Sequence, residues 1–351
     1  MQLNINKTFN SMIKKTLYGL GAFLLLSSLI VLVLWNIRPR PAELSRYGLE
    51  KKMDTPLPFT VTFLGNTNLL FDDGENAWMT DAFFTRPNAT EVLFGQVKPN
   101  KAVIQKCLEK AEIDNLDMII PVHSHFDHAM DAALVADMTK AYLWGSSSTL
   151  NIGRGHGLDE EQMMTPQWDS QYTVGKFKIQ VVKSKHWQYP DAAQRKVLLE
   201  NEISVPLHPP ASIFDYKEGD SYTILVDYEG LKFAIQASAG YREGSIPNDF
   251  DADILFLAIA GLEAMDASYI NGYQKHLIDP LKAEILVPIH WDDFTTPLGD
   301  ELKTTNLIFN WKYSSDLGQA FKEIEKRNPN KTIRVLKAWE KYSIKEVLKE
   351  E

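Results

Sequence analysis

The chain has 351 residues, of which 44% are hydrophobic and 24% charged, and its formal net charge is −9. This composition is typical of a folded globular protein and excludes collagen-like, low-complexity and disordered chains. The acidic balance argues against a nucleic-acid partner, because phosphate binding leaves a basic footprint. A single cysteine, Cys107, excludes an intramolecular disulfide, so the fold must rest on its core or on a metal. The oligomeric state is left open.

Residues 16–37 form an uncharged run rich in Leu, Val, Ile and Phe. As a helix, this run would reach roughly 33 Å, enough to cross a hydrocarbon core of about 30 Å. A cleaved signal peptide normally has a shorter apolar region and a small-residue cleavage site, and the ending LVLWNIRPRP has none. We therefore predict a single-pass membrane protein with four parts: a short basic tail (1–15), a transmembrane signal-anchor helix (16–37), a linker (38–57) and a large soluble domain (58–351).

The orientation of the anchor is decided by two opposing features. A short basic start, an apolar run and then a large domain is the layout of a signal anchor, which favours an extracytoplasmic domain. The Arg and Lys residues that follow the run do not favour this orientation under the positive-inside rule. We keep the extracytoplasmic domain as the prediction.

The soluble part alternates between strand and helix patterns. Between residues 58 and 84, three apolar runs predict strands, the last two joined by the turn DDGEN (72–76). Further strands are expected at 116–122, 141–145, 172–185 (one long strand or a pair), 221–238 (a hairpin turning at 228–230), 252–259, 283–290 and 332–339. Helices are expected at 101–113, 131–141, 265–281 and 314–326. The irregular, proline-containing stretch 186–221 is a candidate binding loop or lid. This alternation predicts an α/β or α+β layered domain.

Four potential metal ligands follow the predicted buried strand 116–122 within six positions: His123, His125, Asp127 and His128. In an extended segment His123 and His125 point to the same side and can bind one metal, while Asp127 and His128 can face a second. His186 and His290 stand at the ends of two other predicted strands, where layered α/β folds place their sites. Imidazole nitrogen with carboxylate oxygen is a zinc ligand set that manganese and iron tolerate. A chance cluster or a buried core histidine would explain one of these residues but not four.

The pattern H-x-H-x-D-H after a buried strand resembles the signature of the metallo-β-lactamase superfamily, and residues 60–84 resemble its opening strands. The resemblance covers roughly residues 58–300, and its nearest branch is that of lactonases and N-acylphosphatidylethanolamine phospholipase D. It implies a four-layer αββα sandwich that holds one or two ions, with zinc favoured over manganese or iron. It also implies that His123, His125 and His186 hold the first metal, and that Asp127, His128 and His290 hold the second.

One position departs from the family pattern. The family usually supplies an Asp that bridges both metals, and Ser238 stands there in the matching stretch 236–240. Because neutral Ser is a poor ligand, we expect a weaker second site or a mononuclear enzyme. Asp127 is the expected catalytic residue, as a ligand of the second metal or as the general base if that site is empty. Asp81 is expected behind a metal-bound His as a hydrogen-bond acceptor, with a turn cap as the alternative. Asp292 and Asp293 either support the metal ligands from behind or are solvated turn residues, and we favour the latter.

The expected activity is attack by a metal-activated water on an ester, lactone or phosphodiester bond. Aromatic residues near the ligands either belong to the core or line an apolar pocket: Phe126, Trp187, Tyr189, Tyr241, Trp291 and Phe294. With a membrane anchor, they favour a small-molecule or lipid-like substrate. One alternative is a degenerate, non-catalytic member that binds metal or acts as an accessory membrane protein, which Ser238 favours. A nuclease of the same fold is a second alternative, and the acidic balance opposes it.

Overall fold

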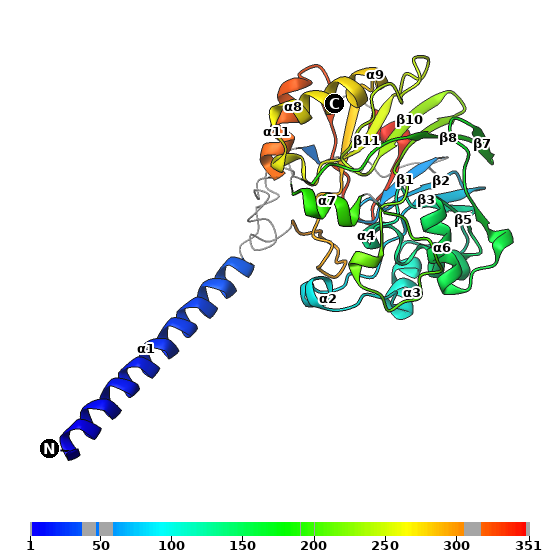
Figure 1. Ribbon diagram of the computed structural model, residues 1–351. Helices are drawn as coiled ribbons and strands as arrows, with labels where there is room; N and C mark the ends of the chain where they lie inside the picture. Colours follow the sequence, from blue (N-terminus) through cyan, green and yellow to red (C-terminus); the bar gives the residue numbers. More distant parts are fainter. Residues whose placement is uncertain are drawn as a thin grey trace.

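The computed structural model describes residues 2–36, 47–48, 59–189, 191–199, 201–304 and 317–348 (Figure 1). Apart from residues 47–48, the predicted linker lies outside the described residues. The boundaries of the predicted parts therefore stay predictions.

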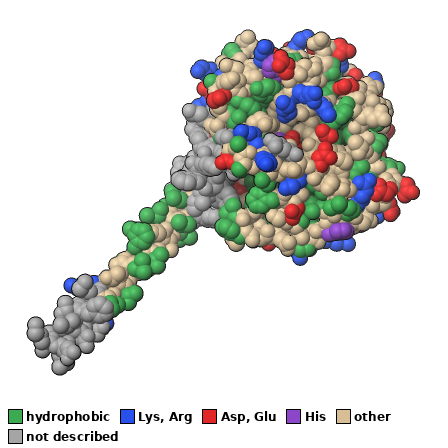
Figure 2. All heavy atoms as spheres, viewed as in Figure 1, with side chains coloured by type: hydrophobic (Ala, Val, Ile, Leu, Met, Phe, Trp, Pro, Cys, Tyr) green, Lys and Arg blue, Asp and Glu red, His purple; other side chains and the backbone are tan. Residues whose placement is uncertain are grey.

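The N-terminal helix α1 runs over Gln2–Asn36. Its segment Ile13–Leu34 spans 22 residues, and none of its most apolar window is buried. Leu25 is 72% exposed, and Figure 2 shows hydrophobic side chains along this helix. A core helix of a soluble protein would bury such side chains. The helix has the length and composition to cross a membrane, and its direction across one stays a prediction.

Two seven-stranded sheets form the folded domain. The first has the order β14-β1-β2-β3-β4-β5-β6, with β1 Thr60–Phe63, β2 Leu69–Asp72, β3 Ala77–Thr80, β4 Met118–Ile120, β5 Tyr142–Trp144, β6 Met163–Met164 and β14 Lys341–Ser343. The second has the order β13-β12-β11-β10-β9-β8-β7, with β7 Gln171–Val174, β8 Phe177–Lys183, β9 Tyr222–Tyr228, β10 Leu231–Gln236, β11 Ile254–Ala258, β12 Ile285–Ile289 and β13 Thr332–Ile333.

The main core lies between the two sheets. Alternate side chains of one strand point to opposite faces, so Leu69 and Phe71 of β2 join this core while Leu70 packs on the other face of the sheet. Aromatic rings fill the centre; Phe71, for example, stacks on Phe233 with ring centroids 4.8 Å apart. The parallel strands β11 and β12 are buried along their length, which explains their continuous apolar sequences.

Helices cover both outer faces of the sheets (Figure 1). The first sheet packs against α3 (Lys101–Lys110) and α5 (Ala132–Thr139). Apolar residues of α8 (Ala267–Tyr273), α9 (Asp279–Leu281), the π-helical turn η6 (Gln274–Ile278) between them and α11 (Leu317–Arg327) join the cluster of the second sheet. This arrangement confirms the four-layer αββα sandwich. The thiol of Cys107 on α3 is buried, and burial raises its pKa to about 11, as expected of a structural cysteine.

Two expectations for the loops were wrong. The predicted strand 332–339 is a strand only at Thr332–Ile333, because the chain then crosses to the first sheet and pairs there as β14. The stretch 186–221 is not wholly irregular, since it contains α7 (Ala192–Leu198) and the 3-10 turn η4 (Ile213–Asp215). Elements that were not expected include α2 (Ala89–Phe94), α4 (Phe126–Ala129), α6 (Ser147–His156), η3 (Glu160–Gln162), η5 (Leu262–Ala264) and α12 (Ile344–Leu348).

Candidate metal centre

Strand ends deliver the six predicted ligands to one place. His123 and His125 follow β4, and His125 is the N-cap of the short helix α4, on which Asp127 and His128 lie. His186 follows β8, and His290 follows β12 directly, in the left-handed region at φ 57°. The structure brings all six side chains together as two groups of three, and within each group the donor atoms lie within 4.8 Å of one another.

The first group consists of His123, His125 and His186, all of which are buried. His123 Nε2 and His125 Nδ1 lie 3.1 Å apart. Two nitrogens bound to one tetrahedral zinc at about 2.0–2.1 Å would be about 3.3 Å apart. The spacing of these donors therefore suits a metal ion bound between them.

In two of the three imidazoles, a hydrogen bond to a backbone carbonyl oxygen fixes which ring nitrogen faces the other donors of the group. His125 Nε2 lies 3.2 Å from the Leu198 carbonyl oxygen, and His186 Nδ1 lies 2.8 Å from the Trp187 carbonyl oxygen. A carbonyl oxygen can only accept, so these two nitrogens carry the ring protons. The opposite nitrogens, His125 Nδ1 and His186 Nε2, are therefore left with lone pairs that face the group.

The environment keeps the first group neutral. Burial lowers the pKa of His123 and of His186 well below the ordinary value, and the neighbouring imidazoles lower both further. Burial also lowers the pKa of His125, to about 4. Metal ligation requires neutral imidazole, so these three residues are in their ligand form at neutral pH. Together with the donor spacing and the inward lone pairs, this means that the residues present fit a metal ion.

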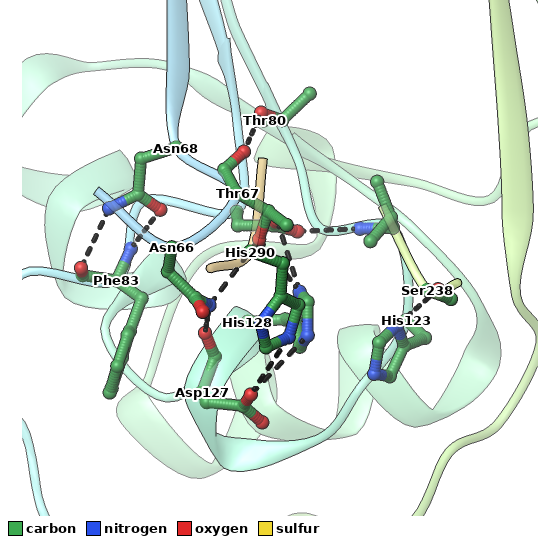
Figure 3. Close-up of polar contacts among 12 residues, drawn as sticks. Asn66, Thr67, Asn68, Thr80, Phe83, His123, Asp127, His128, Ser238 and His290 are labelled. Atoms are coloured by element: carbon green, nitrogen blue, oxygen red, sulfur yellow. Dashed lines mark hydrogen bonds and ion pairs between the residues drawn. The ribbon is translucent and has the colours of Figure 1, made fainter. Parts of the chain in front are cut away.

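The second group consists of Asp127, His128 and His290 (Figure 3). Asp127 Oδ2 lies 3.5 Å from His128 Nε2 and 3.4 Å from His290 Nε2. Burial opposes the charge of Asp127, but the two imidazoles outweigh it and hold the pKa of this carboxyl far below its usual range. Burial likewise opposes a charge on His128, while Asp127 and Asp81 raise its pKa. The carboxylates therefore favour the protonated form of His128, and a metal bound at Nε2 would displace that proton.

Asp81 lies where the sequence placed it, behind a ligand histidine. Its Oδ2 is 3.1 Å from His128 Nδ1, and its Oδ1 accepts a hydrogen bond of 2.8 Å from the backbone N–H of Val122. The residue is fully buried and has a positive φ of 59°. Since an ionised carboxylate can only accept, His128 donates through Nδ1 and turns Nε2 toward Asp127.

The buried turn between β1 and β2 supports the second group and was missed in the sequence. Asn66 Nδ2 donates to the Asp127 carbonyl oxygen at 2.6 Å, and Thr67 Oγ1 lies 3.1 Å from His128 Nδ1 (Figure 3). The backbone N–H of His290 donates to the Asn66 carbonyl oxygen at 2.6 Å. Polar residues between two apolar strands usually indicate an exposed turn, and nothing in the sequence distinguishes this fully buried one.

Glu218 and Leu198 support the first group and were also missed. The backbone N–H and carbonyl oxygen of Glu218 bond to Leu198 and Ser124, and its side chain accepts from the backbone N–H of His186 at 3.2 Å. Burial raises the pKa of Glu218 to about 7. Glu218 thus links the two segments that carry the imidazoles to Leu198, whose carbonyl oxygen accepts from His125. It lies 32 positions from His186 in the chain.

Ser238 lies behind His123 and belongs to neither donor group. Its Oγ is 2.9 Å from His123 Nδ1, and its backbone N–H donates to Gln236 Oε1 at 2.9 Å. A hydroxyl can either donate or accept. Without a metal, His123 can therefore donate through Nε2 to His125 and accept from Ser238. If Nε2 held a metal, the ring proton would be on Nδ1, and Ser238 Oγ would accept a hydrogen bond from it.

The expectation for Asp292 and Asp293 was wrong, because both are buried. Asp292 lies 3.2 Å from Arg86 Nη2 and accepts from the backbone N–H of Asn66 at 2.5 Å. Asp293 accepts hydrogen bonds from Thr295 and Thr296 within its own turn. Asp292 thereby anchors the buried turn that holds the second group.

The aromatic residues divide between the core and the metal centre. Phe126 and Trp291 are buried in core clusters, and Phe294 packs edge-on against Phe126. Tyr189 stacks on the His186 ring with centroids 5.5 Å apart, and Trp187 contacts Tyr189. Tyr241 stacks on His276 instead.

No protein-family model and no curated protein sequence matches this chain. Among solved structures, the chain is similar to a metallo hydrolase from Ignicoccus hospitalis, with 15% identity, a TM-score of 0.49 and coverage of 81% of this chain and 97% of that one. A metallo-beta-lactamase fold protein from Bacillus subtilis has 16% identity and a TM-score of 0.47, over 81% and 99% of the two chains. An isothiocyanate hydrolase from Delia radicum gut bacteria has 15% identity and a TM-score of 0.49, over 81% and 99%.

The chain's own architecture carries the fold assignment. Two facing sheets, helices on both outer faces and two donor groups at the strand ends are the arrangement that the H-x-H-x-D-H motif predicted. The metallo-β-lactamase fold is thus confirmed. The branch of lactonases and N-acylphosphatidylethanolamine phospholipase D stays a prediction.

Proposed function

We propose that this chain is a membrane-anchored, metal-dependent hydrolase that acts on an ester, lactone or phosphodiester bond. The observation that supports it most is the first donor group: three buried imidazoles, kept neutral, with two of their inward lone pairs fixed by backbone carbonyl oxygens. Burying three polar rings side by side is costly unless they bind something. A structural role would not need their nitrogens to converge.

His123, His125 and His186 would hold the first metal, and Asp127, His128 and His290 the second. Zinc suits this donor set best, and manganese or iron is the alternative. A metal ion bound here would lower the pKa of a bound water towards neutral pH, and as a Lewis acid it would polarise the scissile group. The Asp127 carboxylate stays ionised between two imidazoles. It can therefore hold a proton of the attacking water, or ligate the second metal when that position is filled.

The two metal positions are unequal in this proposal. The first has three imidazoles, and the hydroxyl of Ser238 supports one of them from behind. The second has one carboxylate and two imidazoles, and Asp127 is the one carboxylate in the two groups found among the described residues. Each metal would then bind without a shared anionic ligand, and we expect the first position to fill before the second.

The substrate is proposed to be a small or lipid-like molecule rather than a nucleic acid, in line with the net charge of −9. Helix α1 would hold the enzyme in a membrane as a single-pass anchor, with the catalytic domain on the extracytoplasmic side. Residues 16–36 of this helix carry no charge and are long enough to cross a bilayer, which suits an anchor.

The deciding experiment is elemental analysis of the full chain, purified in detergent and loaded with zinc, manganese or iron. We expect one tightly bound ion per chain, and a second only at higher metal concentration. The variant His186→Asn should lose the tight ion, while His208→Asn, which changes an exposed histidine outside both groups, should retain it.

Turnover of esters, lactones and phosphodiesters should require the tight ion. A metal content near zero after loading with each of the three metals would overturn the hydrolase proposal. It would leave the non-catalytic accessory protein as the better explanation.

A further inference from the structure

Large apolar side chains that remain exposed are unevenly distributed over the folded domain. Outside α1, the described residues include six: Leu93, Phe94, Tyr142, Val197, Val205 and Phe214. All except Tyr142 lie on α2 or on the segment between β8 and β9. Phe94 is the most exposed, at 86%. Single exposed apolar residues need no explanation, but their concentration on two neighbouring segments does.

Leu93, Phe94, Val197 and Phe214 form what we call the apolar rim. Val97 and Ala211 pair through two backbone hydrogen bonds of 2.8 and 3.0 Å, which brings the segments of Phe94 and Phe214 side by side. Lys217 Nζ donates to the Val197 carbonyl oxygen at 3.2 Å and so joins α7 to the segment of Phe214.

The apolar rim borders the metal centre. The residue after Val197 is Leu198, whose carbonyl oxygen accepts from His125 Nε2. Val92 and Val97, on either side of the exposed pair Leu93 and Phe94, pack in the same buried cluster as Phe126, which lies between His125 and Asp127. The rim is thus one layer of side chains away from the ligands.

The chain itself supplies the surface that such a rim would contact. Helix α1 ends at Asn36, and the chain already contacts the folded domain at Tyr47 and Gly48, where Gly48 pairs with Val335. The intervening 10 residues, 37–46, reach at most about 36 Å even when fully extended. If α1 crosses a bilayer, the domain can never diffuse far from it. Exposed Phe and Leu side chains gain free energy by entering the boundary between headgroups and acyl chains.

We propose that the apolar rim rests on the bilayer that α1 crosses and turns the metal-centre edge of the domain toward the lipid. This inference rests on the proposed membrane anchoring and deepens it, because it selects the substrate class. An amphipathic ester or phosphodiester would enter the site from the membrane rather than from water.

The test uses full-length protein in phosphatidylcholine–phosphatidylglycerol vesicles that contain a spin-labelled lipid as a quencher. A fluorophore is attached at Gln96→Cys, an exposed position beside the rim that leaves Phe94 in place. Cys107, buried with its pKa raised to about 11, does not compete for the label. The matched control is Tyr142→Cys, at the start of β5, the end of the sheet opposite His123. A third label, at Leu26→Cys, reports on insertion of α1.

We expect lipid quenching at position 96 to exceed that at position 142 severalfold. Adding Leu93→Ser and Phe94→Ser to the Gln96→Cys protein should reduce it to the level of position 142, with unchanged metal content. Strong quenching at position 26 but equal, weak quenching at positions 96 and 142 would overturn the rim and leave the anchor standing. Absence of quenching at position 26 would overturn the anchor and the rim together.

Discussion

The protonation state of each imidazole in the metal centre is decided by the atom behind it. His125 and His186 face backbone carbonyl oxygens, which can only accept, and His128 faces the Asp81 carboxylate. His290 differs, because its Nδ1 is buried without a hydrogen-bond partner among the described residues. We infer that His290 is the least firmly oriented of the ligands.

These surroundings predict how many protons each metal displaces. At pH 6, three free imidazoles of pKa 6.5 would together hold about two protons. Binding of the first metal should release fewer than about one proton from the first group. Its three histidines have lowered pKa values and are already neutral at this pH. The second metal should release about one proton, because the pKa of His128 is raised.

Calorimetric zinc titration of the metal-free protein at pH 6, in two buffers of different ionisation enthalpy, counts these protons. Release of about two protons with the first metal would contradict the described environment of the first group.

Ser238 offers a second test at the scale of one residue. Replacement by Asp adds an acceptor that fixes the proton on His123 Nδ1 and introduces a negative charge behind His123, whose ring centroid lies 3.9 Å from that of His128 in the second group. We expect Ser238→Asp to raise the affinity for the second metal by about tenfold or more, the equivalent of about 1.4 kcal/mol. Ser238→Ala removes the hydrogen bond of 2.9 Å to His123 and should instead lower the affinity for the first metal.

Equilibrium competition with a metal chelator measures both affinities. If the Asp and Ala variants had the same affinities for the first and the second metal, the residue at position 238 would not affect the two metal sites differently.

At the scale of elements, the centre depends on loops that cross where β8 and β10 end. The backbone N–H of Trp187 donates to the Ser238 carbonyl oxygen at 2.9 Å, which ties the loop of His186 to the loop of Ser238. Gly240 lies at this crossing, and a Cβ there would collide with the backbone of Lys185 and His186. The close approach explains why a residue without a side chain stands at this position.

Gly240→Ala should therefore separate the two loops. We expect a loss of about 1–3 kcal/mol in the free energy of unfolding and weaker binding of the first metal. Gly299→Ala is a suitable control, because the nearest atom to its added Cβ would be 3.6 Å away. Chemical denaturation and metal titration of both variants give the comparison. An unchanged metal affinity in Gly240→Ala would mean that the loop of His186 is placed by other contacts, such as that with Glu218.

At the scale of the whole molecule, two parts with opposite solvent preferences share one chain. The folded domain buries its apolar residues between and outside its sheets, whereas α1 leaves nearly all of its own exposed. The difference is physical: a single helix has no second layer to pack on within the described chain, so only lipid or another molecule can cover it.

This contrast predicts where the protein is found in a cell. Two charges in the middle of α1, in the double variant Leu25→Arg and Leu26→Arg, would each cost about 2.5–3.5 kcal/mol in a bilayer. We expect this protein to leave the membrane fraction, while Leu25→Phe with Leu26→Phe stays in it. Carbonate extraction of membranes measures the distribution. Loss of the unmodified protein's N-terminal segment by cleavage would instead identify a signal peptide.

Much of the architecture could be predicted because its signals are local. The apolar runs that became β4, β9, β10, β11 and β12 and the helical patterns of α3 and α5 are short-range periodicities that packing did not override. The prediction of one strand at 332–339 was wrong, because this segment leaves one sheet and crosses to the other. Local sequence does not encode which sheet a residue pairs with. The prediction that Asp292 is exposed to solvent was wrong, because its partner Arg86 is more than 200 residues away in the chain.

The sequence by itself determined the identity of the six donor residues, a layered α/β domain and the apolar N-terminal helix, because each depends on residue type and spacing over a short stretch. The family resemblance added the αββα order and the division of the donors into two groups, and only the tertiary structure decided which nitrogen of a ring faces inward. It also decided that the turn at residues 65–68 and Glu218 hold them in place. Those facts depend on hydrogen bonds between segments that meet only in the folded chain, where burial makes every unpaired polar atom costly.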